Sequence, residues 1–373
     1  MSVPLTMAEE GEAGCERESL AAYSRGKLSL KDFEWPQSLR VSFPLVYSDS
    51  QSIPEIDLQA LLGQQNDKQQ QQLQLLSEAV STCGFFQVVN HPIPASAIRC
   101  LDSHARKFFS SPLQRKLELA KAFGRMMTEF DIRPGYTCGS PLESPLKLWY
   151  EALLIAASDK DNVSAVAKCL CADEEEEYTF KDALEKFSFG FTKLARDLCT
   201  ILLETLGLDA NEILEEYVDG NEQGVGVKLL HYPPCPQPEK TAGLPEHTDI
   251  CLLTVLWQDE VGGLQVCQDG CWITVKPNVD AMVVNIGDIF QVCSNDRFKS
   301  GLHRVALNKN ESRYSIASFY NPRRDFKLTP LPQLLDSTNE AAKFRSMIPV
   351  EYRKLTFKET FNGAWQGVNV LRC

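Results

Sequence analysis

The 373-residue sequence predicts an α+β protein with a mainly β core, folded as an antiparallel sandwich or barrel and flanked by helices. Two observations lead to this prediction. Between about residues 224 and 320, short β-rich segments alternate with turn signals, a rhythm typical of antiparallel strands rather than βαβ units. On both sides of this region, apolar residues recur with the period of an α-helix.

The N-terminal part of the chain combines short strands with helices. Residues 53–58 predict a strand with a proline near its start, and the glutamine-rich stretch 64–74 predicts a solvated helix start or a loop. Helical periodicity over 73–82 comes before a buried strand expected over 84–90. A further helical region is expected over 95–121.

The middle of the chain begins with a loop-like stretch. Residues 122–150 are rich in Gly, Pro and Ser, and we expect turns at 135–136 and 139–141. The acidic run 173–177 predicts a solvated helix N-terminus or a loop. Apolar periodicity over 179–218 predicts one or two buried helices.

The β-rich region should supply the strands of the core, and residues 335–362 should form a helical segment that folds back over it. The expected strands cover 225–232, 252–257, 263–266, 272–275, 282–286, 303–306 and 314–320.

Composition excludes several classes of protein. A net charge of −12 argues against nucleic-acid binding, which requires basic groups to neutralise phosphates. No apolar run approaches the roughly 18 residues of a membrane span, and residues 1–14 resemble neither a signal peptide nor a transit peptide. The 13 cysteines show no paired zinc-module spacing, and an odd count without a secretory signal fits a reducing compartment, so we expect a cytoplasmic protein.

A metal site is indicated by two of the five histidines. In His247-Thr248-Asp249, side chains at i and i+2 point to one face of an extended strand, and the turn signal at 242–245 places the pair at a strand entrance. His303 begins another expected strand. Two histidines and one carboxylate form the facial triad of non-haem iron(II) oxygenases. His247, Asp249 and His303 are therefore the candidate metal ligands.

A second pair of residues strengthens this interpretation. Arg313 and Ser315 are again at i and i+2 on one strand, and a guanidinium beside a hydroxyl suits bidentate capture of a carboxylate. The other histidines suggest no chemistry. We expect His91 to be structural, His104 to lie on a solvated helix face, and His231 to face away from its neighbour Tyr232.

These residues and several accompanying motifs resemble the 2-oxoglutarate- and iron(II)-dependent dioxygenases of plants. The similarity runs from about residue 53 to 330. The accompanying motifs are Gly-Phe-Phe-Gln-Val-Val-Asn-His at 84–91, Tyr-Pro-Pro-Cys-Pro at 232–236, Gly-Gly-Leu-Gln-Val at 262–266, Val-Asn-Ile-Gly-Asp at 284–288 and Ser-Asn-Asp at 294–296.

The resemblance implies a distorted double-stranded β-helix (jelly roll) flanked by helices, with Fe(2+) near its open end. It implies 2-oxoglutarate as co-substrate, held by Arg313, Ser315 and Tyr232, with ascorbate as reductant, molecular oxygen and a small-molecule substrate as partners, and a monomer. One residue departs from the family, in which Asn is frequent at the position of Leu230. That departure puts the co-substrate contacts in doubt.

We expect four regions along the chain. Residues 1–50 should be a partly ordered leader, followed by an N-terminal helical and strand region (51–220). The jelly-roll core that binds iron and 2-oxoglutarate should cover 221–330, and a C-terminal helical segment (331–373) should lie over the barrel.

The segments around Tyr136 and Trp149 are similar to gibberellin 2-oxidases that act on twenty-carbon precursors, and both residues are candidates for substrate binding. The resemblance implies 2-oxidation of a gibberellin-type or kaurane-type diterpenoid acid, which inactivates a hormone or its precursor. Lys147 or Arg133 could meet the substrate carboxylate. Three alternatives stay open: an oxygenase of flavonoids or other phenolics, an oxidase of this fold that does not use 2-oxoglutarate, and a catalytically silent hormone-binding protein.

Overall fold

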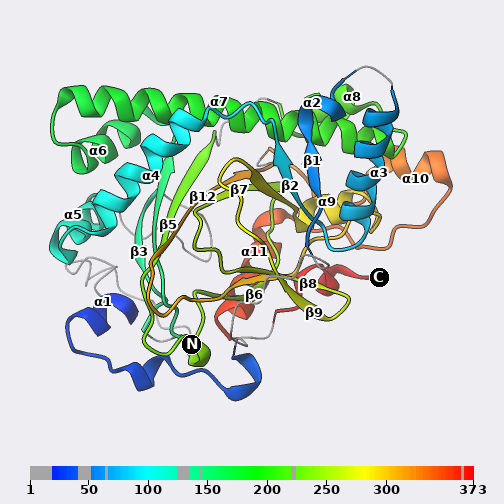
Figure 1. Ribbon diagram of the computed structural model, residues 1–373. Coiled ribbons are helices and arrows are strands. Elements are labelled where there is room, and N and C mark those ends of the chain that lie inside the picture. The colour runs from blue at the N-terminus through cyan, green and yellow to red at the C-terminus, as the bar shows by residue number, and fades with distance from the viewer. Residues whose placement is uncertain are drawn as a thin grey trace, which may run out of the picture.

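The computed structural model describes residues 19–40, 52–63, 66–123, 134–142, 144–219, 224–323, 325–362 and 365–373. A large sheet and a small sheet lie at the centre of the molecule, and helices cover the outer face of the large one (Figure 1). Among the described residues, no helix combines the length and the apolar character that crossing a membrane would take.

The large sheet has eight strands, antiparallel except for the parallel pair at one edge. In spatial order they are β1 (Glu55–Asp57), β2 (Phe85–Val89), β10 (Met282–Ile286), β7 (Leu253–Gln258), β12 (Arg313–Tyr320), β5 (Gly226–Tyr232), β4 (Glu151–Ala156) and β3 (Gly135–Cys138). The small sheet has four strands, in the order β6 (Leu244–His247), β11 (His303–Val305), β8 (Leu264–Gln268) and β9 (Cys271–Thr274).

The helices surround these sheets. They are α1 (Ser19–Ser24), α2 (Leu58–Leu61), α3 (Asp67–Ser81), α4 (Ala95–Phe109), α5 (Leu113–Phe123), α6 (Lys160–Leu170), α7 (Glu174–Thr205), α8 (Ala210–Tyr217), α9 (Asp288–Cys293), α10 (Pro332–Thr338) and α11 (Pro349–Asn362). Several begin at an Asp or Asn side chain that accepts hydrogen bonds from the first-turn amides, which defines the start of the helix. These N-caps are Asp57, Asn66, Asp159, Asp173 and Asp209.

Strand alternation gives the large sheet two different faces. The inner face packs on the small sheet through a separate apolar core, in which Phe85 and Val283 contact Leu264 and Val266. The outer face is covered by α4, α6 and α7 (Figure 1). On α7 an apolar stripe that includes Phe180, Phe187 and Phe191 is fully buried. The two sheets form the expected jelly roll, and the larger part of the hydrophobic core lies between the large sheet and the helices.

The expected core strands are all present, each within about two residues of its expected bounds. The acidic run begins α7 behind the N-cap Asp173, as expected. The C-terminal segment is helical over the barrel but divides into α10 and α11, because the chain between them makes bridges at Leu328–Met347 and Phe344–Arg372 instead.

Two expectations are wrong. Gly135 and Tyr136 do not form a turn but begin strand β3, because pairing with β4 satisfies their backbone groups and outweighs the local glycine. The second is His104, which is not solvated: it is only 5% exposed and packs against Phe180 of α7.

The strand β4 and the helices α6 and α9 were not expected from the sequence.

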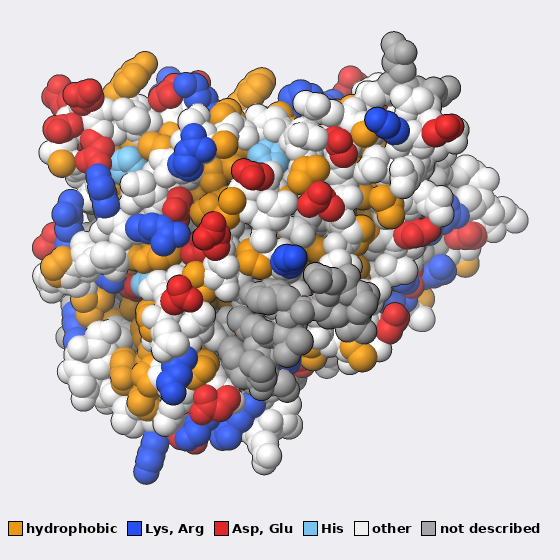
Figure 2. All heavy atoms as spheres, viewed as in Figure 1, with side chains coloured by type: hydrophobic (Ala, Val, Ile, Leu, Met, Phe, Trp, Pro, Cys, Tyr) orange, Lys and Arg blue, Asp and Glu red, His pale blue; other side chains and the backbone are white. Residues whose placement is uncertain are grey.

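On the face shown in Figure 2, acidic and basic side chains are interspersed, and acidic ones gather over the junction of α6 and α7. This distribution agrees with a net charge of −12.

Candidate metal and co-substrate site

The two candidate histidine ligands lie opposite each other in the small sheet. His247 ends β6 and His303 begins β11, and the two residues are direct antiparallel partners. Their ring centroids are 4.2 Å apart. Pairing across the strands therefore brings together two residues that are distant in the sequence.

Asp249 reaches the histidines from the loop that follows β6, so the His247–Asp249 pair lies at a strand end and not at a strand entrance. Its Oδ1 is 3.9 Å from His247 Nε2, and its Oδ2 is 3.8 Å from His303 Nε2. The loop folds tightly against β10, and the amide of Asp288 donates to the Asp249 carbonyl at 2.7 Å. Gly287 permits this approach, because a Cβ there would lie 2.0 Å from the Cys251 carbonyl oxygen.

Hydrogen bonds orient each of the three candidate ligands. His247 Nδ1 lies 2.8 Å from the Pro245 carbonyl and His303 Nδ1 lies 2.9 Å from the Gly301 carbonyl. Donation from Nδ1–H leaves the Nε2 lone pairs free for a metal. Thr254 and Asn285 donate to Asp249 Oδ2 at 2.6 and 3.0 Å.

The charges of the triad suit a divalent cation. Burial, together with the neighbouring His303, lowers the pKa of His247, so this imidazole is neutral at pH 7. Burial opposes ionisation of Asp249, but His303 and His247 and the two hydrogen bonds hold the pKa of its carboxyl below the ordinary value. The site thus presents neutral imidazole nitrogen and an ionised carboxylate.

The ligand atoms of His247, Asp249 and His303 all lie within 4.8 Å of one another. Two imidazoles and one carboxylate on one side of a site leave the opposite positions open, the arrangement of non-haem iron(II) oxygenases. The donor set and its orientation fit iron(II).

Arg313 and Ser315 lie on the same face of β12, as expected. Arg313 is 2% exposed, and its Nη1 and Nη2 donate to Ser315 Oγ and Gln258 Oε1, each at 3.1 Å. Its Nε makes no hydrogen bond, and none of the described residues pairs a carboxylate with this guanidinium. The charge of Arg313 acts on the nearby carboxylate of Asp259, but that carboxylate is bonded to Arg106 and to the amide of Tyr314. A buried guanidinium with an unused Nε–H is therefore suited to an incoming carboxylate.

Tyr232 and Leu230 on β5 line the same region. Tyr232 is the cross-strand partner of Arg313, whose guanidinium carbon lies 5.0 Å from the tyrosine ring centroid. Burial raises the pKa of Tyr232 to about 12, so its hydroxyl keeps its proton. Leu230 pairs with Ser315 and is buried. The position where family members often have Asn therefore presents an apolar surface beside Ser315.

Lys228 is a further cation on this face of β5, which sequence reasoning missed. It is two residues from Leu230 and four from Tyr232, so strand alternation points its side chain inward with theirs. It makes no hydrogen bond or ion pair with the described residues, and burial lowers its pKa to about 8, an effect that Asp249 opposes. The same alternation could have identified it from the sequence.

The two candidate substrate residues have other contacts. Tyr136 is fully buried among the helices on the outer face of the large sheet, where its hydroxyl donates to Glu151. Trp149 packs against Tyr23 and Phe33 of the N-terminal segment, and its Nε1 donates to the Pro233 carbonyl at 3.1 Å.

The suggested carboxylate anchors do not provide a free cation in the described structure. Lys147 donates to the carbonyls of Leu142 and Ser144. Arg133 lies outside the described residues.

Other supporting residues were also missed. Thr254 and Asn285 donate to the candidate ligand Asp249, Gln258 accepts from Arg313, and Trp365 of the C-terminal segment donates to Thr248 Oγ1 at 2.9 Å. Of these, Asn285 lies within the family motif at 284–288. Trp365 gave no local signal, because its partner lies 117 residues away in sequence.

Comparison with known proteins agrees with this geometry. The profile of the 2OG-Fe(II) oxygenase superfamily matches residues 224–322, and a profile described as the N-terminal region of the non-haem dioxygenase in morphine synthesis matches residues 53–167. Two relatives from Arabidopsis thaliana are Protein DMR6-LIKE OXYGENASE 2, 30% identical over 88% of each chain, and Gibberellin 3-beta-dioxygenase 1, 32% identical over 74% of this chain and 75% of the relative.

Solved structures show the same fold. The structure of JOX2 in complex with 2OG, Fe and JA has a TM-score of 0.71 and 29% identity, and covers 92% of this chain and 93% of that one. The rice dioxygenase for auxin oxidation has a TM-score of 0.66 and 25% identity, over 86% of this chain and all (100%) of that one. The chain belongs to the 2OG-Fe(II) oxygenase superfamily, among its plant oxygenases. It is an oxidoreductase that uses iron(II) and 2-oxoglutarate.

Proposed function

We propose that this oxygenase hydroxylates a small carboxylic acid, of the gibberellin or kaurane diterpenoid type, and thereby inactivates a hormone or its precursor. The proposal that the substrate is an acid rests on Lys228. It is a half-buried cation beside the candidate iron ligands, without an anionic partner among the described residues. The names of two relatives, Gibberellin 3-beta-dioxygenase 1 and Gibberellin 20 oxidase 1-B, support the diterpenoid class.

The candidate residues on the inner face of the large sheet and in the small sheet have separate binding roles. His247, Asp249 and His303 hold iron(II), and Arg313 and Ser315 bind the far carboxylate of 2-oxoglutarate, with Tyr232 beside them. Bound iron with 2-oxoglutarate and oxygen supplies the oxidation of an unactivated C–H bond, with succinate and carbon dioxide as co-products.

Lys228 lies at the other end of this face. It pairs with Ala317, four residues from Arg313 along β12, a separation of about 13 Å along the strand. Arg313 and Lys228 thus provide two separate carboxylate sites. We assign Arg313 to the co-substrate and Lys228 to the substrate, because Ser315 and Gln258 surround only the first with further polar groups.

The test is succinate release by the purified chain with iron(II), ascorbate, oxygen and 2-oxoglutarate. The panel contains twenty-carbon and nineteen-carbon gibberellins, kaurenoic acid and flavonoids, and the best substrate is also supplied as its methyl ester. We expect one diterpenoid acid to stimulate succinate release and to yield a hydroxylated product, and its ester to be a poor substrate.

Lys228→Met should raise the KM of the acid by about tenfold to a hundredfold and leave that of the ester unchanged, since a charge-assisted hydrogen bond is lost. Lys168→Met, on the exposed face of α6, is the matched control. Equal turnover of acid and ester by the unaltered chain would refute the role of Lys228. Stimulation by flavonoids alone would replace the diterpenoid by a phenolic substrate.

A further inference from the structure

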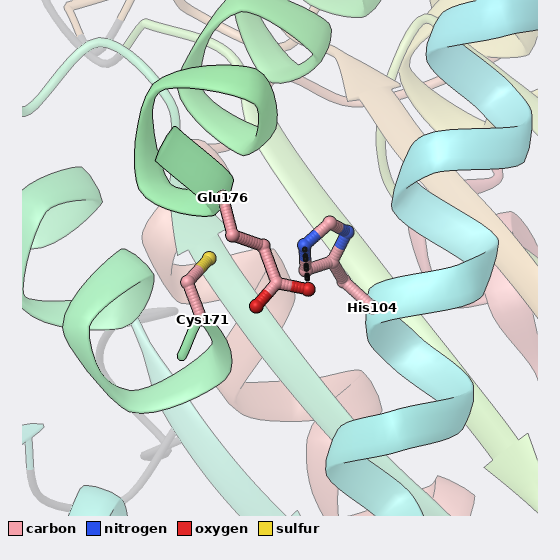
Figure 3. Close-up of side chains that lie close together, drawn as sticks. All are labelled: His104, Cys171 and Glu176. Carbon is pink, nitrogen blue, oxygen red and sulfur yellow. Dashed lines mark ion pairs between the residues drawn. The ribbon is translucent and has the colours of Figure 1, made fainter. Parts of the chain in front are cut away.

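A second group of potential metal ligands lies outside the oxygenase site. His104 on α4, Cys171 at the end of α6 and Glu176 in the first turn of α7 point toward one another (Figure 3). Their ligand atoms all lie within 4.8 Å of one another. The three residues come from three helices, and two of them are buried.

The orientation of His104 is that of a metal-binding histidine. Its Nδ1 lies 2.8 Å from the carbonyl of Cys100, one turn earlier on the same helix. This is the backbone contact that also orients His247 and His303. Donation from Nδ1–H leaves the Nε2 lone pair directed into the cluster.

The Nε2 atom of His104 lacks a hydrogen-bond partner although its side chain is only 7% exposed. The nearest acceptor, Glu176 Oε1, is 3.4 Å away. With the ring proton on Nδ1, the Nε2 lone pair faces this oxygen, whereas a protonated ring would form the ion pair drawn in Figure 3. A cation bound between them would coordinate Nε2 and a free lone pair of Oε1, which also contacts Lys107.

Cys171 adds a soft donor to this pair. Burial and the neighbouring carboxylates of Glu176 and Glu177 raise the pKa of its thiol to about 12, so without a cation the thiol keeps its proton. A divalent metal displaces such a proton, and binding releases it to solvent. The environment is thus unfavourable for an isolated thiolate and favourable for a thiolate bound to a dication.

Glu176 is already held in place by other groups. Its Oε2 accepts from the amide of Ala172 at 2.7 Å, and the ammonium of Lys107 contacts Oε1. Each carboxylate oxygen has a second lone pair, so these contacts orient the group and leave donor capacity for a metal.

We propose that His104, Cys171 and Glu176 bind a thiophilic divalent cation, of which Zn2+ is the best fit, with water as the fourth ligand. Nitrogen, sulfur and oxygen donors in a near-tetrahedral arrangement are the ligands of protein zinc sites. The cation would join α4, α6 and α7 on the outer face of the large sheet. Its function would be structural, and it would be independent of the candidate iron site.

The test uses Co2+ as a spectroscopic substitute for zinc in the full-length chain under anaerobic conditions. A cysteine ligand gives a thiolate-to-cobalt charge-transfer band in the near ultraviolet, and the His-Asp-His site cannot produce one because it has no sulfur. We expect two bound equivalents of cobalt per chain, one of which carries this band.

Matched variants separate the two sites. Cys171→Ser should lose the band and one equivalent of cobalt, whereas Cys169→Ser, two residues away, should keep both. Asp249→Ala should lose the other equivalent and keep the band. Should Cys171→Ser fail to fold, Glu176→Gln supplies the same test from a side chain that is 21% exposed.

Two results would overturn the proposal. One is a single equivalent of cobalt, without a thiolate band, that Asp249→Ala removes; His104 and Glu176 would then form an ion pair only. The other is a band that persists in Cys171→Ser. Neither result bears on the oxygenase activity, which is measured separately by succinate release.

Discussion

At the scale of single residues, the site depends on polar groups that are buried and fully oriented. Arg313 illustrates this, because its guanidinium is fixed by Ser315 and Gln258 before any carboxylate binds. A lysine at the same position would place one point charge where Arg presents a planar fork.

Arg313→Lys should therefore raise the KM for 2-oxoglutarate by about tenfold to a hundredfold, the equivalent of one lost charge-assisted hydrogen bond. The measurement is the dependence of succinate release on 2-oxoglutarate concentration. Arg297→Lys, which alters a surface ion pair with Glu340, serves as the control. An unchanged KM would place the co-substrate elsewhere.

A second buried polar group lies behind the site, on the helix-facing side of the large sheet. Glu151 accepts from His231 at 2.8 Å and from Lys116 at 2.6 Å, and the carboxylate is 6% exposed. Burial alone would raise the pKa of Glu151, but its hydrogen bond with His231 and the charge of Lys116 hold it below the ordinary 4.5. Because the folded-state pKa is lowered, the group stabilises the fold above pH 4.5, and this contribution is lost as the pH falls further.

Glu151→Gln should destabilise the fold at pH 7 by about 3–5 kcal/mol, since it leaves buried Lys116 without a counter-charge. The difference from the unaltered chain should narrow as the pH falls below 4.5. Urea unfolding at several pH values measures both effects. Glu204→Gln, at an exposed position near the end of α7, should show neither.

At the scale of elements, the C-terminal helix α11 and the segment after it hold the metal loop. The hydroxyl of Tyr352 donates to Asp288 at 2.6 Å, and Trp365 donates to Thr248 between the two candidate ligands. Asp288 in turn donates its backbone amide to Asp249. Two hydrogen bonds from the C-terminal segment thus support the loop that carries the candidate ligand Asp249.

Tyr352→Phe should reduce stability by about 1–3 kcal/mol, because the buried Asp288 loses a donor. We also expect weaker iron binding, since α9 and the ligand loop share a hydrogen bond. Urea unfolding and iron titration measure the two effects. Tyr178→Phe, at a tyrosine that is 74% exposed on α7, should change neither. Lost stability with unchanged iron affinity would show that α11 does not position the loop.

At the scale of the whole molecule, bound iron(II) and 2-oxoglutarate are expected to connect the two sheets. The candidate iron ligands belong to the small sheet and its loop, whereas Arg313 and Ser315 belong to the large sheet. One 2-oxoglutarate that contacts both the metal and Arg313 would bridge the sheets.

Under anaerobic conditions, iron(II) at one hundred times its Kd should therefore stabilise the fold by about 2.7 kcal/mol, and added 2-oxoglutarate should stabilise it further. Thermal melts with each ligand alone and with both measure this. Asp249→Ala should keep the fold, lose the iron-dependent shift and abolish turnover. An undiminished iron-dependent shift in the thermal melt, or normal turnover, in that variant would refute the assignment of Asp249 as a metal ligand.

Local sequence alone determined the features that depend on strand period and on motifs. The alternation of β12 places Arg313 and Ser315 on the same face of the sheet. The alternation of β5 places His231 and Tyr232 on opposite faces, because side-chain direction in a strand repeats every two residues. The core strands followed from the same period, the start of α7 from its acidic run, and the candidate triad from the spacing of His247, Asp249 and His303.

Only the tertiary structure decided the rest, because long-range pairing is not encoded by local periodicity. Register between β6 and β11 brings His247 to His303, and the close approach at Gly287 places Asp249 in a loop rather than on a strand. Pairing with β4 turned the expected turn at Gly135 into a strand. The packing of three helices buried His104 beside two groups with no shared motif, since contacts between distant segments depend on the whole fold.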